Sequence, residues 1–454
     1  MKDNRQKCDK NYHNECVTTP GYGEKAQPVA CNSDGLHSLI HEEITLPAAV
    51  IKSSSLKNNL DWMQRFANQH KVKLSPHGKT TMTPAFFQQQ LENGAWGITV
   101  ATPAQAEIAA LGGAKNIIMA NQLVGRANMT IIANLIETHG INFYCCVDSS
   151  RNVKALERAF AEHQLPLNVL IEFGVEGGRC GCRNQQDVVD LATLIHQQPH
   201  LTLKGIEVYE GVIHGDNAEQ NIRDFLNTTL EIAAQLQSDK LIESKPLVTG
   251  AGSAWYDVVS ECFANLEDFD AIIRPGCYAI HDTGIYLDAQ NKVMQRAENN
   301  QGAACDLGGD LESALELWAY VISRPEPTKL VAGFGKRDVA FDAGLPTPER
   351  AYREGASISI ESAVTTAVMD QHAFIEVDAN SDLQVGDMIA FSTSHPCLTF
   401  DKWRAVAVCD DEYQVTHWVK TRFENPFLMM SLVRLFVILH AKPVEAAQSP
   451  PCKR

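Results

Sequence analysis

The chain has 454 residues, of which 44% are hydrophobic and 21% are charged, and its formal net charge is −16 at pH 7. The length exceeds the size at which one core stops growing, and the composition excludes a disordered or fibrous chain. The net charge excludes a general nucleic-acid binder, because phosphate binding relies on clustered Lys and Arg. We therefore expect a two-domain enzyme that acts on a small molecule.

The N-terminal segment and the cysteines indicate the compartment. Residues 1–36 are polar and contain no apolar run of the kind that a signal peptide requires, so we interpret them as a flexible leader of a cytoplasmic protein. The 13 cysteines are scattered through a long chain, unlike those of a short disulfide scaffold. Most of them are expected to be reduced thiols.

From about residue 46 to residue 280, short β-rich runs alternate with amphipathic stretches. The expected strands are "AAVIK", "GITVAT", "NIIMAN", "INFYCCVD", "LNVLIEF", "LKGIEVY", "KPLVTGAG" and "DAIIRPGCYAI". Helical patterns such as "TPAQAEIAALGG" and "SRNVKALERAFAEHQ" lie between several of them. The alternation predicts a (β/α)8 TIM-type barrel over residues 37–305, with active-site groups at the C-terminal ends of its strands.

After about residue 310 the pattern changes to strands and turns, which predicts an all-β domain over residues 306–423. The fold class is therefore α/β, with a barrel followed by a C-terminal all-β domain. In the tail, residues 424–454, the apolar stretch "FLMMSLVRLFVILHA" is too short to span a bilayer. We interpret it as a docking helix rather than a membrane attachment, followed by a disordered end.

Lys79 lies in the segment "SPHGKTTM", directly after the strand-like run "KVKL". A lysine at the C-terminal mouth of an early barrel strand is partly desolvated by the barrel walls. Such an amine can have a lowered pKa and form an imine with a carbonyl or with pyridoxal. Spacing alone leaves the alternative of a solvated lysine at a strand end.

Two glycine-rich strand ends come last in the barrel pattern. Gly252 and Ser253 lie in "VTGAGSAWYD", and Gly276, Cys277 and Tyr278 lie in "IIRPGCYAIHD". Phosphate often binds in the loops after the last two barrel strands, where small residues let backbone N–H groups approach the anion. Glycines also build ordinary tight turns, but their occurrence at both strand ends favours a phosphate site.

Two further motifs carry polar side chains that could bind a ligand. Arg179 follows another strand in "IEFGVEGGRCGCR", where the glycines would let it approach a phenolate-type oxygen or a carboxylate. His395 and Cys397 in "STSHPCLTFDKW" are two residues apart, so on an extended segment both side chains would share one face. Imidazole and thiolate form a zinc-type pair that leaves positions open for water or substrate. A buried cysteine beside a surface histidine is the alternative.

Together these motifs resemble those of the fold type III pyridoxal-phosphate enzymes, in the branch of D-serine dehydratase, D-threonine aldolase and "amino acid deaminase". The resembling segments are "SPHGKTTMTPAFFQQQLENGAWGITVATPAQAE", "RPGCY", "FGKRDVAFDAGLP" and "SHPCLTFDKW", and the similarity covers residues from about 40 to 423. The resemblance implies an alanine racemase-like barrel that binds pyridoxal 5′-phosphate. It also implies a divalent metal in the β domain and a homodimer in which that domain completes the neighbouring active site.

The resemblance assigns roles to individual residues. Lys79 would be the Schiff-base lysine and the general base at Cα, and His395 and Cys397 would hold the metal. The implied cofactor-binding residues are Lys79, His77, Arg179, Tyr209, Gly252, Ser253, Arg274, Gly276, Cys277 and Tyr278. Among these, Arg179 would approach the phenolic oxygen, Tyr209 would lie against the pyridine ring and Arg274 would lie near the ring nitrogen.

The identity of the second metal ligand favours one reaction. The resemblance implies an aspartate at the second metal-ligand position in the aldolases of the branch, whereas this sequence has Cys397 at that position. A cysteine ligand favours Zn²⁺ over Mg²⁺ or Mn²⁺, and zinc in turn favours dehydration. The implied reaction converts a D-3-hydroxy amino acid such as D-serine, D-threonine or D-threo-3-hydroxyaspartate into a 2-oxo acid and ammonia. Retro-aldol cleavage to glycine and an aldehyde is the first alternative, and a non-catalytic pyridoxal phosphate carrier is the second.

Overall fold

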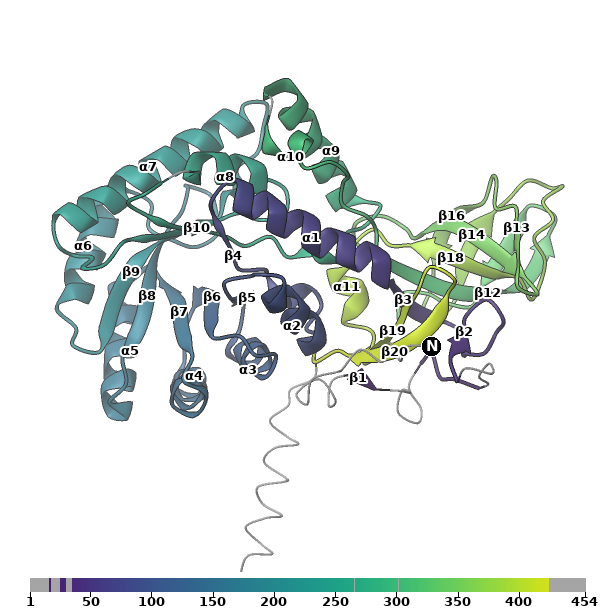
Figure 1. Ribbon diagram of the computed structural model, residues 1–454, viewed down its shortest axis with the longest axis horizontal. Coiled ribbons are helices and arrows are strands. Elements are labelled where there is room, and N and C mark those ends of the chain that lie inside the picture. Colours follow the sequence, from purple (N-terminus) through teal and green to yellow (C-terminus); the bar gives the residue numbers. More distant parts are fainter. Residues whose placement is uncertain (1–15, 18–24, 30–34, 265, 301, 424–454) are drawn as a thin grey trace, which may run out of the picture.

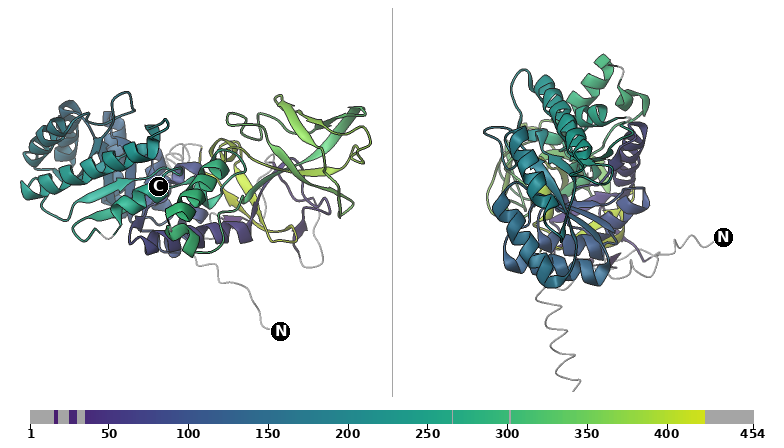
Figure 2. Two further views of the ribbon diagram at one scale, coloured as in Figure 1. Left: turned by 90° about the horizontal axis from the view of Figure 1, so that it is seen from above. Right: turned by 90° about the vertical axis from the view of Figure 1, so that its left-hand side faces the viewer.

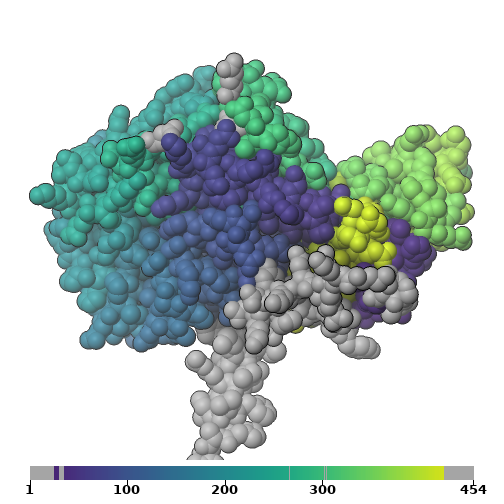
Figure 3. Space-filling model, in the orientation of Figure 1, coloured from purple at the N-terminus to yellow at the C-terminus, as the bar shows by residue number. Residues whose placement is uncertain are grey.

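The computed structural model describes residues 16–17, 25–29, 35–264, 266–300 and 302–423. A lobe of parallel strands surrounded by helices and a lobe of antiparallel strands lie side by side along the longest axis (Figures 1 and 2). The space-filling view shows the antiparallel lobe projecting from the larger helical one (Figure 3). The tail at 424–454 and most of the leader at 1–36 lie outside the described residues.

Eight parallel strands form the first sheet, in the order β4-β11-β10-β9-β8-β7-β6-β5. They are β4 (Lys73–Leu74), β5 (Ile98–Val100), β6 (Asn116–Gln122), β7 (Asn142–Val147), β8 (Leu167–Phe173), β9 (Leu201–Val208), β10 (Leu247–Gly250) and β11 (Asp270–Ile273). A parallel bridge between His77 and Thr99 connects the segment after β4 to β5, so the two ends of the sheet meet. The predicted barrel is confirmed.

Helices connect most of these strands and cover the outside of the sheet (Figure 1). They are α1 (Ser53–Gln69), α2 (Pro84–Glu92), α3 (Pro103–Leu111), α4 (Arg126–His139), α5 (Ser150–His163), α6 (Gln185–His196), α7 (Ala218–Ser238), α8 (Tyr256–Phe263), α9 (Ile285–Asn300) and α10 (Ala303–Asp306). The helical periodicity of the sequence arises because one face of each helix is buried. In α5, for example, the apolar residues Val153, Leu156 and Phe160 recur at helical spacing and are all buried. The hydroxyl of Ser149 caps that helix by accepting from the N–H of Asn152.

Twelve strands form the second sheet of the described chain, along the main path β1-β20-β19-β3-β12-β13-β17-β16. They are β1 (Cys16–Val17), β2 (His37–Ser38), β3 (Ala48–Lys52), β12 (Leu315–Glu326), β13 (Lys329–Ala332), β14 (Thr347–Arg353), β15 (Ala356–Ile358), β16 (Val364–Val368), β17 (Ala373–Glu376), β18 (Met388–Ser392), β19 (Ala405–Cys409) and β20 (Gln414–Lys420). The C-terminal β domain is confirmed, and the short helix α11 (Cys397–Phe400) interrupts it.

The run "AAVIK" is not a barrel strand, so this part of the prediction is wrong. As β3 it pairs antiparallel with β12 and parallel with β19 in the second sheet. Residues 48–51 are buried, and a central strand covered on both faces gives the same continuous apolar run in either kind of sheet. The first barrel strand is β4, the last two residues of the strand-like run "KVKL", which is not among the eight expected strands.

The two lobes are joined where the active site is expected. Helix α1 runs from β3 to β4, and the buried amide of Asn59 donates to the carbonyl oxygens of Ala279 and Glu312, at 3.1 and 2.7 Å. Helix α11 of the β domain lies against the 3-10 turn η2 (Gly78–Thr80), which contains Lys79. None of the helices in the described ranges is long and apolar enough to cross a membrane.

Candidate active site

A cavity of about 130 Å³ lies at the C-terminal ends of the barrel strands, beside helix α11. It is lined by His77, Lys79, Thr80, Ala101, Ala120, Asn121, Arg179, Glu207, Tyr209, Ala251, Gly252, Ser253, Arg274, Gly276, Cys277, Tyr286 and Cys397. All the residues predicted from the sequence are among them except Tyr278 and His395. Folding therefore brings together segments that are far apart in the chain. Thr80 and Cys397, for example, are 317 positions apart.

A larger cavity of about 600 Å³ adjoins the first at Ala101 and Asn121. Its walls come from the ends of β5 and β6 and from the first turns of α3 and α4, and its lining contains no charged side chain. Catalytic chemistry needs titratable groups whose environment tunes them. The smaller cavity, which contains Lys79 and two arginines, is therefore the candidate active site.

Lys79 projects from the turn η2, which begins at Gly78, four positions after the first barrel strand ends at Leu74. The turn packs closely against Phe87, and this packing requires glycine at position 78, because a Cβ at Gly78 would lie 2.7 Å from the ring of Phe87. Burial, followed by the charges of Lys79 and Arg274, lowers the pKa of neighbouring His77 well below its usual value, so this imidazole is neutral. Its Nδ1 atom is buried and has no hydrogen-bond partner among the described residues, which leaves it available to a ligand.

The two glycine-rich strand ends form a cradle of backbone atoms. The N–H groups of Gly276 and Cys277 point at the hydroxyl of Ser253, at 3.4 and 3.3 Å. A Cβ at Gly276 would lie 2.6 Å from the carbonyl oxygen of His77, so this close approach requires glycine. The N–H of Gly252 instead donates to the carboxylate of Glu210 at 2.7 Å, so this amide already has a partner.

Arg179 and Tyr209 form one wall of the cavity. The Arg179 guanidinium carbon lies 4.2 Å from the centre of the Tyr209 ring, in a cation–π contact. Burial, with the nearby Glu210 carboxylate, raises the pKa of the Tyr209 hydroxyl, so this ring stays neutral. A flat aromatic face and a fixed guanidinium therefore face the same space as Lys79.

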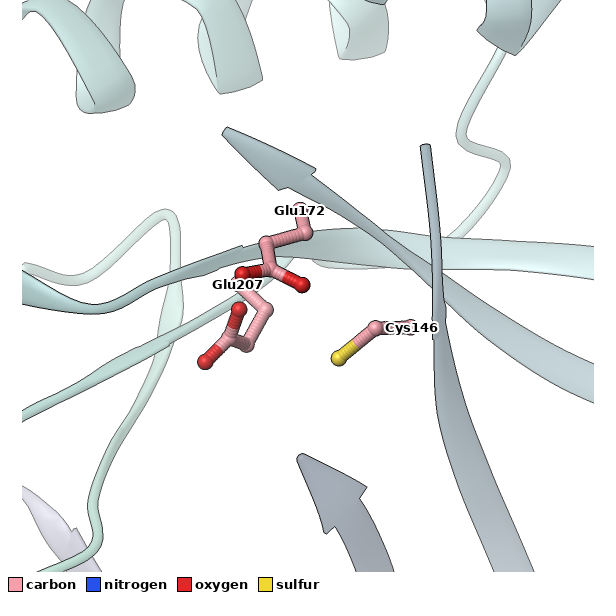
Figure 4. Close-up of side chains that lie close together, drawn as sticks. All are labelled: Cys146, Glu172 and Glu207. Atoms are coloured by element: carbon pink, nitrogen blue, oxygen red, sulfur yellow. The ribbon is translucent and has the colours of Figure 1, made fainter. Parts of the chain in front are cut away.

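Acidic and thiol side chains from neighbouring barrel strands lie close together at the cavity, which Glu207 lines (Figure 4). Donor atoms of Cys146, Glu172 and Glu207 lie within 4.8 Å of one another. This spacing would suit a metal ion, but Arg274 already donates to Glu207, and the amide of Gln122 donates to Glu172 at 2.6 Å. Burial and the charge of Glu207 raise the pKa of Glu172 to about 7. The guanidinium thus supplies the positive charge that a cation would bring.

His395 and Cys397 lie together, though not for the predicted reason. The segment is not extended, because Pro396 adopts helical dihedral angles and Cys397 begins helix α11. The two side chains still interact, and the Nδ1 atom of His395 lies 2.8 Å from the carboxylate of Asp342, which fixes the imidazole. With Nδ1 bound to a carboxylate, Nε2 is the nitrogen free to ligate a metal, as in the carboxylate–histidine–metal arrangement.

The thiol of Cys397 is the acidic one at this site. Hydrogen bonds with Cys277, His395 and Thr80 lower the pKa of this thiol to about 5, although burial opposes the shift. Hydrogen bonds with Cys397 and Asp342 raise the pKa of His395 to about 9. A thiolate next to a carboxylate-bound imidazole is a donor pair suited to a zinc-type metal.

Tyr278 is the predicted cofactor-binding residue that lies outside the cavity lining. It is buried, and its hydroxyl accepts from Gln90 of α2 at 3.2 Å, outside the cavity lining. Sequence reasoning missed Glu207, Tyr286 and Asp342. Glu207 lies in the expected strand "LKGIEVY", where an acidic residue in an apolar run was the available signal, whereas nothing local marks the other two.

The barrel, the β domain and a lysine-containing cavity between them define the class of pyridoxal phosphate-dependent enzymes with an alanine racemase-like fold. The chain belongs to the family described as "Alanine racemase, N-terminal domain", whose model matches residues 51–281, more than half of the sequence. A second family model, "Putative serine dehydratase domain", matches residues 314–409.

Individual relatives come from the same group of lyases. A D-threonine aldolase of Arthrobacter sp. is 26% identical over 376 residues, which is 81% of this chain and 90% of the aldolase. The crystal structure of D-threonine aldolase from Filomicrobium marinum superposes with a TM-score of 0.69 at 22% identity, over 85% of this chain and 97% of that one. The structure of D-threo-3-hydroxyaspartate dehydratase from Delftia sp. HT23 superposes with a TM-score of 0.67 at 20% identity, over 85% of this chain and 99% of that one.

Proposed function

We propose that this protein is a pyridoxal phosphate- and zinc-dependent dehydratase that converts a D-3-hydroxy amino acid into a 2-oxo acid and ammonia. The observation that carries the proposal is the thiol of Cys397, which lines the same cavity as Lys79 and interacts with His395. Thiolate and imidazole select zinc, a Lewis acid that can polarise a hydroxyl group and ease its departure. Loss of the β-hydroxyl is the step that distinguishes dehydration from cleavage of a carbon–carbon bond.

The residues of the cavity fit pyridoxal phosphate. Its phosphate suits the backbone N–H groups of Gly276 and Cys277 with the hydroxyl of Ser253, and its ring suits the flat face of Tyr209. When bound, the cofactor supplies an electron sink that acidifies the Cα–H of an amino acid. Lys79 would hold the cofactor covalently and, once released, take the Cα proton at Nζ.

The donor set around helix α11 fits a divalent metal. His395 would bind through Nε2 and Cys397 through Sγ, and Asp342 would keep the imidazole in the correct orientation. This group lies at the edge of the cavity that Lys79 lines, so a hydroxyl of a bound substrate could reach it. The substrate amine and Cα would then face the lysine, and the β-substituent would face the metal.

Product analysis tests the proposal directly. The full-length protein, loaded with pyridoxal phosphate and either zinc or a chelator, is incubated with D-serine, D-threonine and D-threo-3-hydroxyaspartate, with the L-enantiomers as matched controls. Dehydration predicts 2-oxo acid and ammonia from at least one D-substrate, and loss of the activity with the chelator. Retention of cofactor without turnover of any D-substrate would instead indicate a pyridoxal phosphate carrier.

Retro-aldol cleavage is the second candidate, supported by the 26% identity to a D-threonine aldolase over 81% of this chain. The two reactions share the Cα-activating residues and differ in the bond broken at the β-carbon. Glycine with an aldehyde as products would therefore establish the aldolase and exclude dehydration as the main activity.

Light scattering would test the accompanying proposal of a homodimer, which predicts twice the 50.0 kDa mass of one chain.

A further inference from the structure

Cys277 places a second thiol beside Cys397. It follows β11 of the barrel, is buried, and lines the candidate active site together with Cys397 of the β domain. Its Sγ atom lies 3.5 Å from that of Cys397. The hydroxyl of Thr80 lies 3.6 Å from Sγ of Cys277 and 3.4 Å from Sγ of Cys397, so both thiols converge on one point of the cavity wall.

The spacing of the two sulfur atoms matches shared ligation. Both cysteines are free thiols, and their separation of 3.5 Å is far longer than a disulfide bond of about 2.05 Å. Two thiolates on a tetrahedral zinc ion, each at about 2.3 Å, lie about 3.8 Å apart. A side-chain adjustment of a few tenths of an ångström would therefore let one ion bridge Cys277 and Cys397. His395 would have to move farther to join them, because the donor atoms of the three residues are not all within 4.8 Å of one another.

The ligand count points the same way. Catalytic zinc sites use three protein ligands and keep a fourth position open for water or substrate. His395 and Cys397 supply two, and the carboxylate of Asp342 is engaged with His395. The backbone N–H of Cys277 faces Ser253, which leaves its thiol without a role in the phosphate cradle.

We infer that Cys277 is a third protein ligand of the metal ion held by His395 and Cys397, giving a His-Cys-Cys set with one open position. The inference rests on the metal requirement of the proposed function. It also links the lobes, because β11 of the barrel and helix α11 of the β domain would contribute ligands to one ion. Zinc would then connect the phosphate cradle to the site at which the β-hydroxyl departs.

X-ray absorption at the zinc edge tests the inference without measuring activity. The full-length protein is kept reduced and loaded with one equivalent of zinc, and sulfur neighbours at about 2.3 Å are counted. Wild-type protein should show two sulfur neighbours, Cys277→Ala should show one, and the exposed-thiol control Cys305→Ser should keep two. Competition with a chromogenic chelator should show zinc binding at least about tenfold weaker in Cys277→Ala.

Two variants and two readouts separate the outcomes. The cofactor content and the melting temperature of Cys277→Ala test whether the phosphate cradle and the fold are intact. The second variant, Cys397→Ala, should also reduce the number of sulfur neighbours of the zinc to one. One sulfur neighbour in wild-type protein, or an unchanged count in Cys277→Ala, overturns the role of Cys277 while the proposed metal requirement stands. Failure of wild-type protein to bind zinc at all overturns both.

Discussion

Arg274 donates a hydrogen bond to the carboxylate of Glu207, and the two side chains are buried together at the floor of the candidate active site. The guanidinium also donates to the carbonyl oxygen of Val208 at 2.9 Å, so it is tied to the end of β9. Glu172 on the adjacent strand is directly beside Glu207 in register. Burial, followed by the charge of Glu207, therefore raises the pKa of Glu172 above that of an exposed glutamate.

Removal of one partner of this ion pair should be costly. Arg274→Met leaves Glu207 buried and unpaired, so we expect the free energy of unfolding in urea to fall by about 3 to 5 kcal/mol. The double variant Arg274→Met with Glu207→Leu should recover part of that loss, because no buried charge is then left uncompensated. In contrast, Asp61→Ala, which removes the exposed pair with Lys57, should cost less than about 1 kcal/mol. Equal losses in the single and double variants would show that the pair does not act as a unit.

Lys79 should be indispensable for covalent binding of the cofactor. In Lys79→Ala we expect the visible absorbance of lysine-bound pyridoxal phosphate to disappear, and turnover of the D-substrates to fall by a factor of about 10³ or more, since both attachment and proton transfer are lost. Lys73→Ala is a matched control, because Lys73 precedes the same turn but pairs with Asp270 at 2.9 Å. Retention of the absorbance band in Lys79→Ala would assign the attachment to another amine.

Asp342 should act through His395. In Asp342→Asn the imidazole loses its carboxylate partner, so we expect zinc affinity to fall about 10- to 100-fold, as measured by chelator competition. Asp190→Asn on the surface of α6 removes the same charge far from the site and should leave the affinity unchanged. Equal affinities for the two variants would mean that Asp342 does not orient the ligand.

His281 should make the protein sensitive to mild acid. Burial lowers its pKa to about 4, from a usual value of 6.5. Between pH 6.5 and pH 4 the unfolded chain therefore takes up a proton at this residue that the folded protein does not, so stability falls as the pH falls. The full difference amounts to about 3 kcal/mol.

Urea unfolding between pH 4 and pH 7 would measure the contribution of His281. His281→Asn removes the titrating group and suits the left-handed backbone of this position, where φ is 53°. Its stability should fall less between pH 6.5 and pH 4 than that of the wild type. The exposed control His196→Asn should keep the wild-type pH dependence. A variant His281→Asn with the wild-type profile would contradict the assignment.

The barrel was predictable because its evidence is local. Apolar residues at helical spacing, as in α5, and buried runs such as β8 reflect the burial of one element at a time. The strand β3 was misassigned since a buried central strand has the same composition in either sheet, and only the pairing with β12 and β19 distinguishes them. Pattern within a short window cannot report which partner a strand selects.

The sequence alone determined the lysine turn, the two glycine-rich strand ends and the His-x-Cys motif, because each depends on neighbouring residues and on the conformations they allow. Tertiary structure decided the contacts between distant segments: Arg274 with Glu207, His395 with Asp342, and Cys277 with Cys397. These pairs are 67, 53 and 120 positions apart. Their formation depends on strand order in the barrel and on the docking of the β domain against it, which no local pattern encodes.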